Sequence, residues 1–386
     1  MSALEPLLSE EGWAYASAPP QEPDDPGRFH ALFGRDSLIT ALQVLPAAPE
    51  VARATLRALA ARQGRVTDPE VDEQPGKILH EYRPAAEARF AEAGWPVRDG
   101  ALLYYGTADA TSWFLVVLGA LRDAALTAEL EPAWRAAGAW LAGALDAGGG
   151  LVRHGPRTGT GGLAQQGWRD AIAPVERHPH GAGIVREDGS APAPPLADAD
   201  SQAVAVAALG ALARLDPGGG WRERAAALRA RLSAWGTGTM AEEGDGRPVA
   251  GAGSQLGWLL WAGALEPDAA AAAAERLTAP DVLTPYGLRT LAAGHPAFAA
   301  EAYHRGGVWP FDCWLGWGGL RAAGRAAAAE QVRTGVLAAL DDLGLAPELY
   351  AVDAAGVLRP VAVANRVQAW TVGARWAFEH DWDGRA

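Results

Sequence analysis

Residues 308–343 read VWPFDCWLGWGGLRAAGRAAAAEQVRTGVLAALDDL. Apolar residues recur there at three- and four-residue spacing, which predicts two amphipathic helices, Val308–Ala323 and Ala326–Leu343. Only Gly324 and Arg325 separate them, and a turn this short makes an antiparallel helical hairpin. This stretch therefore predicts the unit from which the fold is built.

The same unit recurs along the chain. Four earlier pairs of helices are expected: Ser37–Leu45 with Pro49–Gln63, Ala108–Ala125 with Pro132–Ala147, Ala199–Leu215 with Gly220–Trp235, and Ser254–Leu265 with Asp268–Leu277. An eleventh helix is expected at about Ala364–Glu379, and Leu4–Trp13 is a weak candidate for a twelfth. Alternation typical of strands is limited to short pieces near Leu151–His154 and Leu358–Ala362.

The connections between these helices are uneven in length. Turns within a pair are short, whereas the loops between pairs are long: Gly64–Thr107, Gly148–Asp198, Gly236–Gly253, Thr278–Gly307 and Gly344–Val363. If hairpins repeat around a ring, all the long loops fall at one end, and long loops in a compact domain are usually functional. We therefore expect an all-α fold, an (α/α)6 barrel or six-hairpin toroid. An open solenoid is the rival, but it predicts shorter and more uniform connections.

Length, charge and cysteine content limit the number of domains, the kinds of partner and the cellular location that we expect. No linker divides the 386 residues, so one domain over 1–386 is expected. A net charge of −13 argues against nucleic acid as a partner. Cys313 is the only cysteine, which excludes an intrachain disulfide. The N-terminus lacks a signal-peptide pattern and no run approaches ~18 apolar residues, so a cytoplasmic protein without a membrane span is expected.

Two details of composition point further. Lys77 is the only lysine among 33 basic residues, and a chain rich in Ala, Gly and Arg is typical of a GC-rich bacterial genome. The 16 tryptophans supply flat faces that stack well on sugar rings, although most of them are expected in the core.

Acids, arginines, amides and aromatic residues gather in the long loops, which suits a polyhydroxylated ligand. The candidate substrate contacts are Phe33, Arg35, Asp36, Lys77, His80, Glu81, Arg83, Tyr105, Asp109, Gln166, Trp168, His304, Trp309, Gln368 and Trp370. Structural roles compete with this interpretation: Asp36 and Asp109 lie near helix starts, where aspartate caps amide groups, and the histidines could simply be hydrogen-bonded. The chain has no HExxH, CxxC, GxGxxG, GxxxxGK[ST] or GxSxG motif, so no metal and no cofactor are expected.

Eight motifs in order, GRDSLI, DEQPGKILHEYR, YYGTADAT, QGWRDA, PYGLRTL, YHRGGVWP, PELY and VQAW, span about Phe33 to Trp370. The series resembles the catalytic domain of amylo-α-1,6-glucosidase, the glycogen-debranching enzyme, and its relatives in glycoside hydrolase family 63. The resemblance implies an (α/α)6 barrel that hydrolyses α-glycosidic bonds with inversion. It places the general acid at Asp170 and the general base at Glu348. It also implies that the departing sugar is held by Arg35, Asp36, Gln166, Trp168, His304, Trp309 and Gln368.

The chemistry of inversion agrees with this pair. One protonated carboxyl gives a proton to the leaving oxygen, and an ionised one activates water on the other face, at a separation of roughly 6.5–9.5 Å. Trp168 stands two residues before Asp170, and burial against indole raises a carboxyl pKa. The sequence therefore predicts an acid and a base in two different long loops.

The substrate is less defined than the chemistry. Larger debranching enzymes carry an additional N-terminal domain, and only a short segment precedes Phe33 here. We expect a short α-glucoside as substrate, with glucosylglycerate or mannosylglycerate as alternatives. A carboxylate aglycone could be held by basic loop residues, which could equally neutralise nearby acids: Arg35, Lys77, Arg83, Arg169 and Arg305. A sugar-binding protein, a sugar epimerase and a phosphorylase are further alternatives, and the sequence does not predict an oligomeric state.

Overall fold

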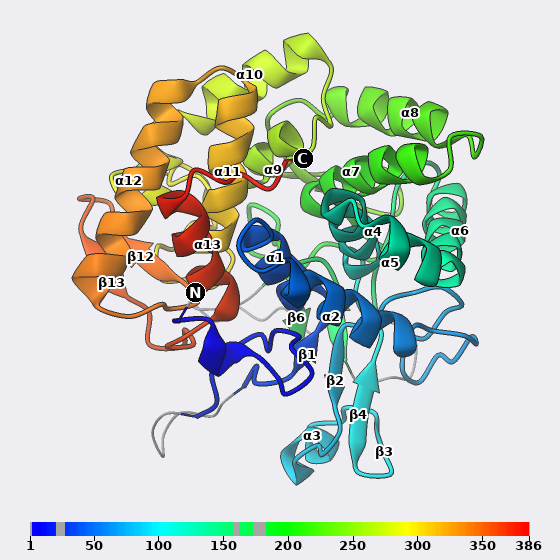
Figure 1. Ribbon diagram of the computed structural model, residues 1–386. Coiled ribbons are helices and arrows are strands. Elements are labelled where there is room, and N and C mark those ends of the chain that lie inside the picture. Colours follow the sequence, from blue (N-terminus) through cyan, green and yellow to red (C-terminus); the bar gives the residue numbers. More distant parts are fainter. Residues whose placement is uncertain (1, 21–27, 157–161, 173–182, 386) are drawn as a thin grey trace.

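The computed structural model describes residues 2–20, 28–156, 162–172 and 183–385. Within these ranges it is mostly helical, with thirteen α-helices. Six of them contact one another in a closed ring, in which each helix touches the next and the last returns to the first. Figure 1 shows this ring around the centre of the molecule, formed by α1 (Gly34–Gln43), α4 (Ala110–Leu121), α7 (Ala199–Leu215), α9 (Gln255–Trp261), α11 (Pro310–Ala322) and α13 (Ala369–Glu379).

Five ring helices have an outer partner that follows in the chain and packs against them. These partners are α2 (Pro49–Ala61), α6 (Glu131–Ala147), α8 (Trp221–Ser233), α10 (Pro267–Leu277) and α12 (Ala326–Leu343). Helices α6, α8, α10 and α12 lie outside the ring in Figure 1. The five predicted hairpins are therefore confirmed, and α7 and α12 begin and end at the predicted residues.

Several predicted helices differ from the structure in their bounds: α1 begins at Gly34 rather than Ser37, and α9 ends at Trp261 rather than Leu265. The weak candidate at Leu4–Trp13 forms only a single 3-10 turn, Glu5–Leu7, because the backbone becomes extended at Leu8, which forms a bridge with Ala14. Helix α4 ends at Leu121, since Arg122 adopts a left-handed backbone with φ of 51°. The predicted turn after it contains a further short helix, α5 (Ala124–Glu129). Helix α13 begins at Ala369 rather than near Ala364.

The expectation of an all-α chain needs correction, because short strands form five small sheets within the described ranges. Each strand has two to four residues, too few for an alternating pattern to be recognised in the sequence. The strands are β1 (Leu32–Phe33), β2 (Glu81–Arg83), β3 (Val97–Arg98), β4 (Ala101–Tyr104), β5 (Leu163–Gln165), β6 (Ala171–Ile172), β7 (Ala197–Asp198), β8 (Thr239–Glu242), β9 (Pro248–Ala250), β10 (Leu283–Thr284), β11 (Gly287–Leu288), β12 (Tyr350–Val352) and β13 (Leu358–Pro360). Of the two pieces predicted, one is β13, and the other contributes only a bridge between His154 and Leu196.

Glycines in the opening hairpin motif explain how two ring helices approach closely. A Cβ atom on Gly257 of α9 would lie 2.5 Å from the Cα of Gly316 of α11, and one on Gly319 would lie 2.4 Å from the carbonyl of Gly257. Only glycine allows this backbone-to-backbone packing. Around it, buried indoles such as Trp314 and Trp317 fill the core.

One segment leaves the helical body and carries a small sheet of its own. Strands β2, β4 and β3 pair in that order and, with the short helix α3 (Ala88–Glu92), form an arm over residues 81–104 that projects from the ring in Figure 1. Strand β1 joins the same sheet through β2, which fixes the arm to the start of α1. In the described ranges no helix has both the length and the apolar character that a bilayer span requires.

Candidate active site

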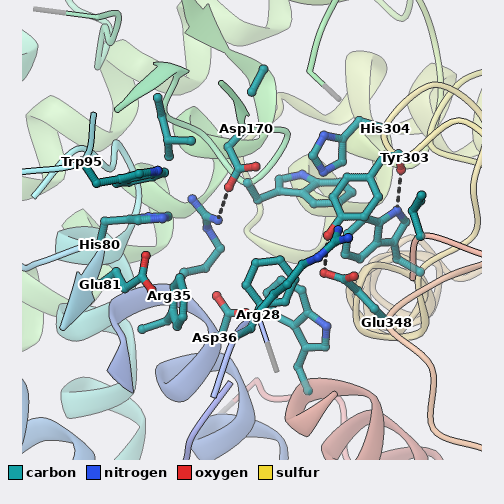
Figure 2. Close-up of a pocket in the computed structure, with 18 of the residues that line it drawn as sticks. Arg28, Arg35, Asp36, His80, Glu81, Trp95, Asp170, Tyr303, His304 and Glu348 are labelled. Atoms are coloured by element: carbon teal, nitrogen blue, oxygen red, sulfur yellow. Dashed lines mark hydrogen bonds and ion pairs between the residues drawn. The ribbon is translucent and has the colours of Figure 1, made fainter. Parts of the chain in front are cut away.

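A cavity of about 640 Å³ opens at the end of the ring where the arm lies. Its wall comes from five chain segments, each of which leads into a ring helix: those before α1, α4, α7, α11 and α13. Figure 2 shows three carboxyl groups, those of Asp36, Asp170 and Glu348, facing the same space. Four of the five long connections thus converge on one site, whereas Gly236–Gly253 contributes no residue to its wall.

Most of the predicted site residues lie in this wall. They are Phe33, Arg35, Asp36, His80, Glu81, Trp168, Asp170, His304, Trp309, Glu348 and Trp370. Six other candidate contacts lie outside it: Lys77, Arg83, Tyr105, Asp109, Gln166 and Gln368. The structure therefore brings the proposed acid and base together with nine of the fifteen proposed substrate contacts.

Gly34 places the first two polar residues of the cavity. A Cβ atom at this position would lie 2.1 Å from the carbonyl oxygen of Leu79, so only glycine lets α1 start directly against that segment. The Gly34 N–H donates to the carbonyl of His80 at 3.0 Å. As a result the first turn of α1 presents Arg35 and Asp36 to the cavity.

Arg35 is a buried cation between two carboxylates. Its Nε lies 2.8 Å from Oδ2 of Asp109, and its Nη1 lies 3.5 Å from Oδ2 of Asp170, on the cavity side. The sequence leaves a helix cap open as the role of Asp109. Asp109 precedes α4, yet its side chain makes no capping bond and instead binds Arg35 and the hydroxyl of Thr107.

Asp170 lies in the connection between β5 and β6. Its side chain is 28% exposed to the cavity, and Figure 2 shows it directed at Arg35. Burial raises the pKa of Asp170 to about 6, and the positive charge of Arg35 limits this rise.

Glu348 follows α12 and belongs to the loop that leads to β12. Its Oε1 accepts a hydrogen bond from the hydroxyl of Tyr303, and its Oε2 accepts one from the backbone N–H of Asn365 at 3.2 Å. Burial raises the pKa of Glu348 to about 8, although both hydrogen bonds favour the carboxylate.

Asp36 is the third carboxyl of the cavity. Its Oδ1 accepts a hydrogen bond from Nε2 of Gln368 at 3.3 Å, so Gln368 supports Asp36 from outside the wall. Burial raises the pKa of Asp36 to about 7. Burial also raises the pKa of Glu81, the fourth carboxyl of the wall, so the cavity favours protonated carboxyl groups near neutral pH.

The two histidines of the wall are held as neutral groups. Burial lowers the pKa of both His80 and His304 well below its usual value. Nδ1 of His304 accepts the N–H of Gly183 at 3.0 Å, and its ring stacks on Trp309 at 5.3 Å. The hydrogen-bonded structural role that the sequence left open therefore applies to His304.

Buried indoles form the floor of the cavity. Trp168 stacks on Trp258 with ring centroids 5.8 Å apart, and it meets the ring of Trp309 edge-on at 5.4 Å. Trp370, in the first turn of α13, stacks on Phe311 at 3.8 Å. These contacts give the cavity a rigid aromatic base suited to the face of a sugar ring.

The candidates outside the wall have other partners. Lys77 and Gln166 line a second pocket behind the site, where Gln166 donates to Asp72 at 2.8 Å. Arg83 pairs with Glu81 from behind, and Tyr105 donates to the carbonyl of Arg62 at 2.7 Å.

Several wall residues were not proposed from the sequence. The arm contributes Arg89, Phe90, Ala93 and Trp95, and the remaining additions are Arg28, Phe29, Leu163, Ala171, Tyr303 and Val363. A tryptophan in a loop was the only signal for Trp95, whereas Tyr303 belongs to a quoted motif. Among the residues described, no group of three or more His, Cys, Asp or Glu is arranged to hold a metal ion.

Comparison with known proteins places the chain in a family. A family model described as the mannosylglycerate hydrolase MGH1-like glycoside hydrolase domain matches residues 35–356. Among solved structures, the GH63 mannosylglycerate hydrolase from Thermus thermophilus, in complex with Tris and D-glycerate, is similar with a TM-score of 0.70. The two sequences are 18% identical, and the match covers 98% of each chain.

Other solved structures share the fold at lower similarity. Neutral trehalase Nth1 from Saccharomyces cerevisiae gives a TM-score of 0.57 at 13% identity, covering 95% of this chain and 77% of that chain. A protein described as a wild-type glycosidase gives 0.56 at 17% identity, covering 100% and 95%. No curated protein matches the sequence. Because the family model covers most of its length, the chain belongs to the mannosylglycerate hydrolase MGH1-like glycoside hydrolases.

Proposed function

We propose that this glycoside hydrolase is one domain over residues 1–386, an (α/α)6 barrel that cleaves a short α-glycoside with inversion. Asp170 acts as the general acid and Glu348 as the general base. The observation that carries the proposal is that these two carboxyls, from loops before different ring helices, line one cavity with raised pKa values. A cytoplasmic location remains part of the proposal.

An inverting pair needs one carboxyl proton and one carboxylate, and the cavity supplies both near neutral pH. The pKa of Glu348, about 8, exceeds that of Asp170, about 6, which by itself favours the reverse assignment. The hydrogen bonds from Tyr303 and Asn365 act in the proposed direction, because both stabilise ionised Glu348. The family resemblance supplies the assignment of Asp170 as acid and Glu348 as base. Rates on a glycosyl fluoride distinguish this assignment from the reverse one.

The cavity has two ends that suit the two halves of a glycoside. The aromatic floor and Asp36 are buried, so they hold the sugar whose anomeric carbon reacts. The arm lies at the outer end, where Ala93 is exposed, so Phe90 and Trp95 face the leaving group.

Glycosylglycerates are the first candidate substrates. The matched family and the Thermus thermophilus neighbour, which is in complex with D-glycerate, support them. Of the basic residues considered for a carboxylate, Arg35, Arg83 and Arg169 bind acidic side chains of the protein itself. Lys77 and Arg305 lie outside the wall, and Arg89 of the wall pairs with Glu87 at 2.7 Å, so Arg28 at the cavity mouth is the first candidate for the carboxylate.

A short α-glucoside such as isomaltose is the second candidate, and a sugar epimerase is a third because His80 and His304 both line the cavity. Epimerisation requires a histidine that can exchange a proton. The ring of His304 is engaged by Gly183 and by the backbone of Asp170, which argues against this role.

The first experiment is a substrate panel with NMR detection. Mannosylglycerate, glucosylglycerate, maltose, isomaltose and trehalose are incubated with the protein, and the anomer released first is recorded. We expect β-sugar from an α-glycoside, and release of α-sugar would overturn inversion. Epimerisation would appear as a changed sugar without cleavage, and binding without turnover would identify a sugar-binding protein.

The second experiment assigns the acid and the base. Fluoride leaves a glycosyl fluoride with little need for a proton, so an acid variant retains activity on it whereas a base variant does not. We expect Asp170→Asn to hydrolyse α-mannosyl or α-glucosyl fluoride but not the O-glycoside. Glu348→Gln should lose both activities. The opposite pattern would reverse the roles.

A further inference from the structure

Arg169 lies between two residues of the cavity wall, Trp168 and Asp170, but is not part of the wall itself. Its side chain is 1% exposed. Trp168 and Asp170 line the cavity, whereas the side chain of Arg169 is buried against neighbouring segments of the ring. A buried cation next to the proposed acid requires an explanation, because burial of a charge is costly unless it is fully paired.

The guanidinium of Arg169 is paired in three directions. Nε lies 3.0 Å from Oδ2 of Asp200, Nη2 donates to Oγ of Ser254 at 2.9 Å, and Nη1 donates to the carbonyl of Thr290 at 2.9 Å. The guanidinium carbon also lies 4.5 Å from the ring of Trp168. Each of the three guanidinium nitrogens therefore has its own partner. Lysine, with a single nitrogen, cannot reproduce these three bonds.

The three partners come from different parts of the ring. Asp200 lies in the first turn of α7, Ser254 is the residue before α9, and Thr290 lies in the loop that leads to α11. By contrast, the sheet that carries Asp170 is small: β5 and β6 register at only two pairs, with a bulge between them. The backbone ladder thus contributes little to fixing this connection, whereas Arg169 ties it to three neighbouring segments.

We propose that Arg169 is a positioning residue for Asp170: by binding Asp200, Ser254 and Thr290 it holds the 168–170 turn so that the carboxyl of Asp170 faces the leaving group. The inference rests on the proposed function, in which Asp170 is the acid. It predicts that loss of Arg169 impairs proton donation more than any other part of the reaction.

The test uses a double variant, Arg169→Met with Asp200→Asn. The single change would leave the buried carboxylate of Asp200 without its cation and could prevent folding, whereas removal of both charges avoids that. Rates are measured on α-mannosylglycerate and α-mannosyl fluoride, and in parallel on the two glucosyl compounds. We expect kcat on the O-glycoside to fall about 100-fold, because a small misplacement of an acid costs that much, while the fluoride rate changes less than about 3-fold.

Three further variants complete the design. Arg169→Lys keeps the charge opposite Asp200 without the fork, so its O-glycoside to fluoride ratio should lie between the wild type and the double variant. Asp170→Asn gives the ratio for complete loss of the acid. Arg153→Met is the matched control, because Arg153 is also largely buried and binds the Glu242 side chain and three backbone carbonyls, but lies outside the wall. Its ratio should equal that of the wild type.

Different outcomes overturn different statements. Equal losses on O-glycoside and fluoride would make Arg169 a purely structural residue and overturn the inference. So would a normal ratio in the folded double variant while Asp170→Asn loses the O-glycoside; in that case the proposed function stands. If Asp170→Asn hydrolyses the O-glycoside at the wild-type rate, Asp170 is not the acid and both proposals are overturned.

Discussion

Nε of Arg35 lies 2.8 Å from Oδ2 of Asp109, and both side chains are buried. Asp109 is therefore neither a wall residue nor a helix cap. It holds a guanidinium whose other nitrogen lies 3.5 Å from the carboxylate of Asp170. Through this pair, a residue outside the cavity influences the charge of the proposed acid.

Asp109→Asn should lower the pKa of Asp170. The negative charge of Asp109 raises that pKa, and its removal also leaves the positive charge of Arg35 less balanced, so ionised Asp170 gains on both counts. In the pH profile of kcat/KM, the limb that reports Asp170 should move to lower pH. Breaking a buried pair should also cost about 3–5 kcal/mol in unfolding free energy, measured by denaturation. An unmoved limb in a folded variant would contradict the coupling.

The pH profile of kcat/KM for an O-glycoside should be bell-shaped, with limbs near 6 and 8. These values follow from the pKa of about 6 for Asp170 and about 8 for Glu348, and they belong to the interacting pair. Below the lower limb both carboxyls are protonated and no base remains. Above the upper limb both are ionised and no acid remains. A profile that is flat from pH 5 to 9 would exclude this pair as the reacting groups.

Glu348→Gln should stabilise the fold at alkaline pH while abolishing activity. Burial raises the pKa of Glu348 from 4.5 to about 8, so folding favours the protonated form. The contribution of this group is complete below about pH 4.5 and is lost as the pH rises through 8, a loss that glutamine avoids. We expect little gain at pH 4.5 and a gain of up to about 5 kcal/mol at pH 8.5, because each pH unit between the two pKa values corresponds to about 1.4 kcal/mol.

Thermal unfolding at the two pH values provides the measurement of that gain. Glu275→Gln, at an exposed glutamate on α10, is the matched control and should show no such pH-dependent difference. A Glu348→Gln variant that is less stable than the wild type at pH 8.5 would show that the ionised carboxylate of Glu348 does not destabilise the folded state.

Trp95→Ala should weaken binding of the leaving group. Trp95 lies on the arm, lines the outer part of the cavity and packs edge-on against Tyr104 with centroids 5.3 Å apart. Loss of its ring should raise KM for the O-glycoside about 10-fold, the equivalent of one aromatic contact, with a smaller change in kcat. The KM for glycosyl fluoride, which has no aglycone, should stay the same.

A matched control for the arm is Trp376→Ala, because Trp376 is also half-buried but lies in α13, outside the cavity wall. It should leave both KM values unchanged. Equal increases in KM for the O-glycoside and the fluoride in Trp95→Ala would place this ring against the sugar instead of the leaving group.

The hairpins were predictable because each helix repeats its apolar residues over several turns. Helix α12 has the predicted bounds, since its pattern runs for eighteen residues and ends at Gly344 in a left-handed conformation. The sheets were not predictable, because β1 and its partners have two to four residues and depend on contacts between distant segments.

The site shows a similar division. Arg35 and Asp36 were predicted because they stand in a motif at a helix start. Lys77 and Gln166 stand in equally clear motifs but line the pocket behind the site. A motif locates a segment, whereas the side that faces the cavity depends on the path of the backbone. Trp95 reaches the cavity because the pairing of β2 with β4 fixes the arm. The residues around Trp95 give no sign of that pairing.

The contact between α1 and α13 has a consequence for synthesis of the protein. Gln368 donates to Asp36 across 332 positions, and the last ring helix must reach the first before the ring is closed. On the ribosome, the nascent chain therefore holds an open arc with exposed apolar faces until residue 379 has emerged. Hydrolytic activity should appear only after that point, and the period before it is when a chaperone would have most to bind.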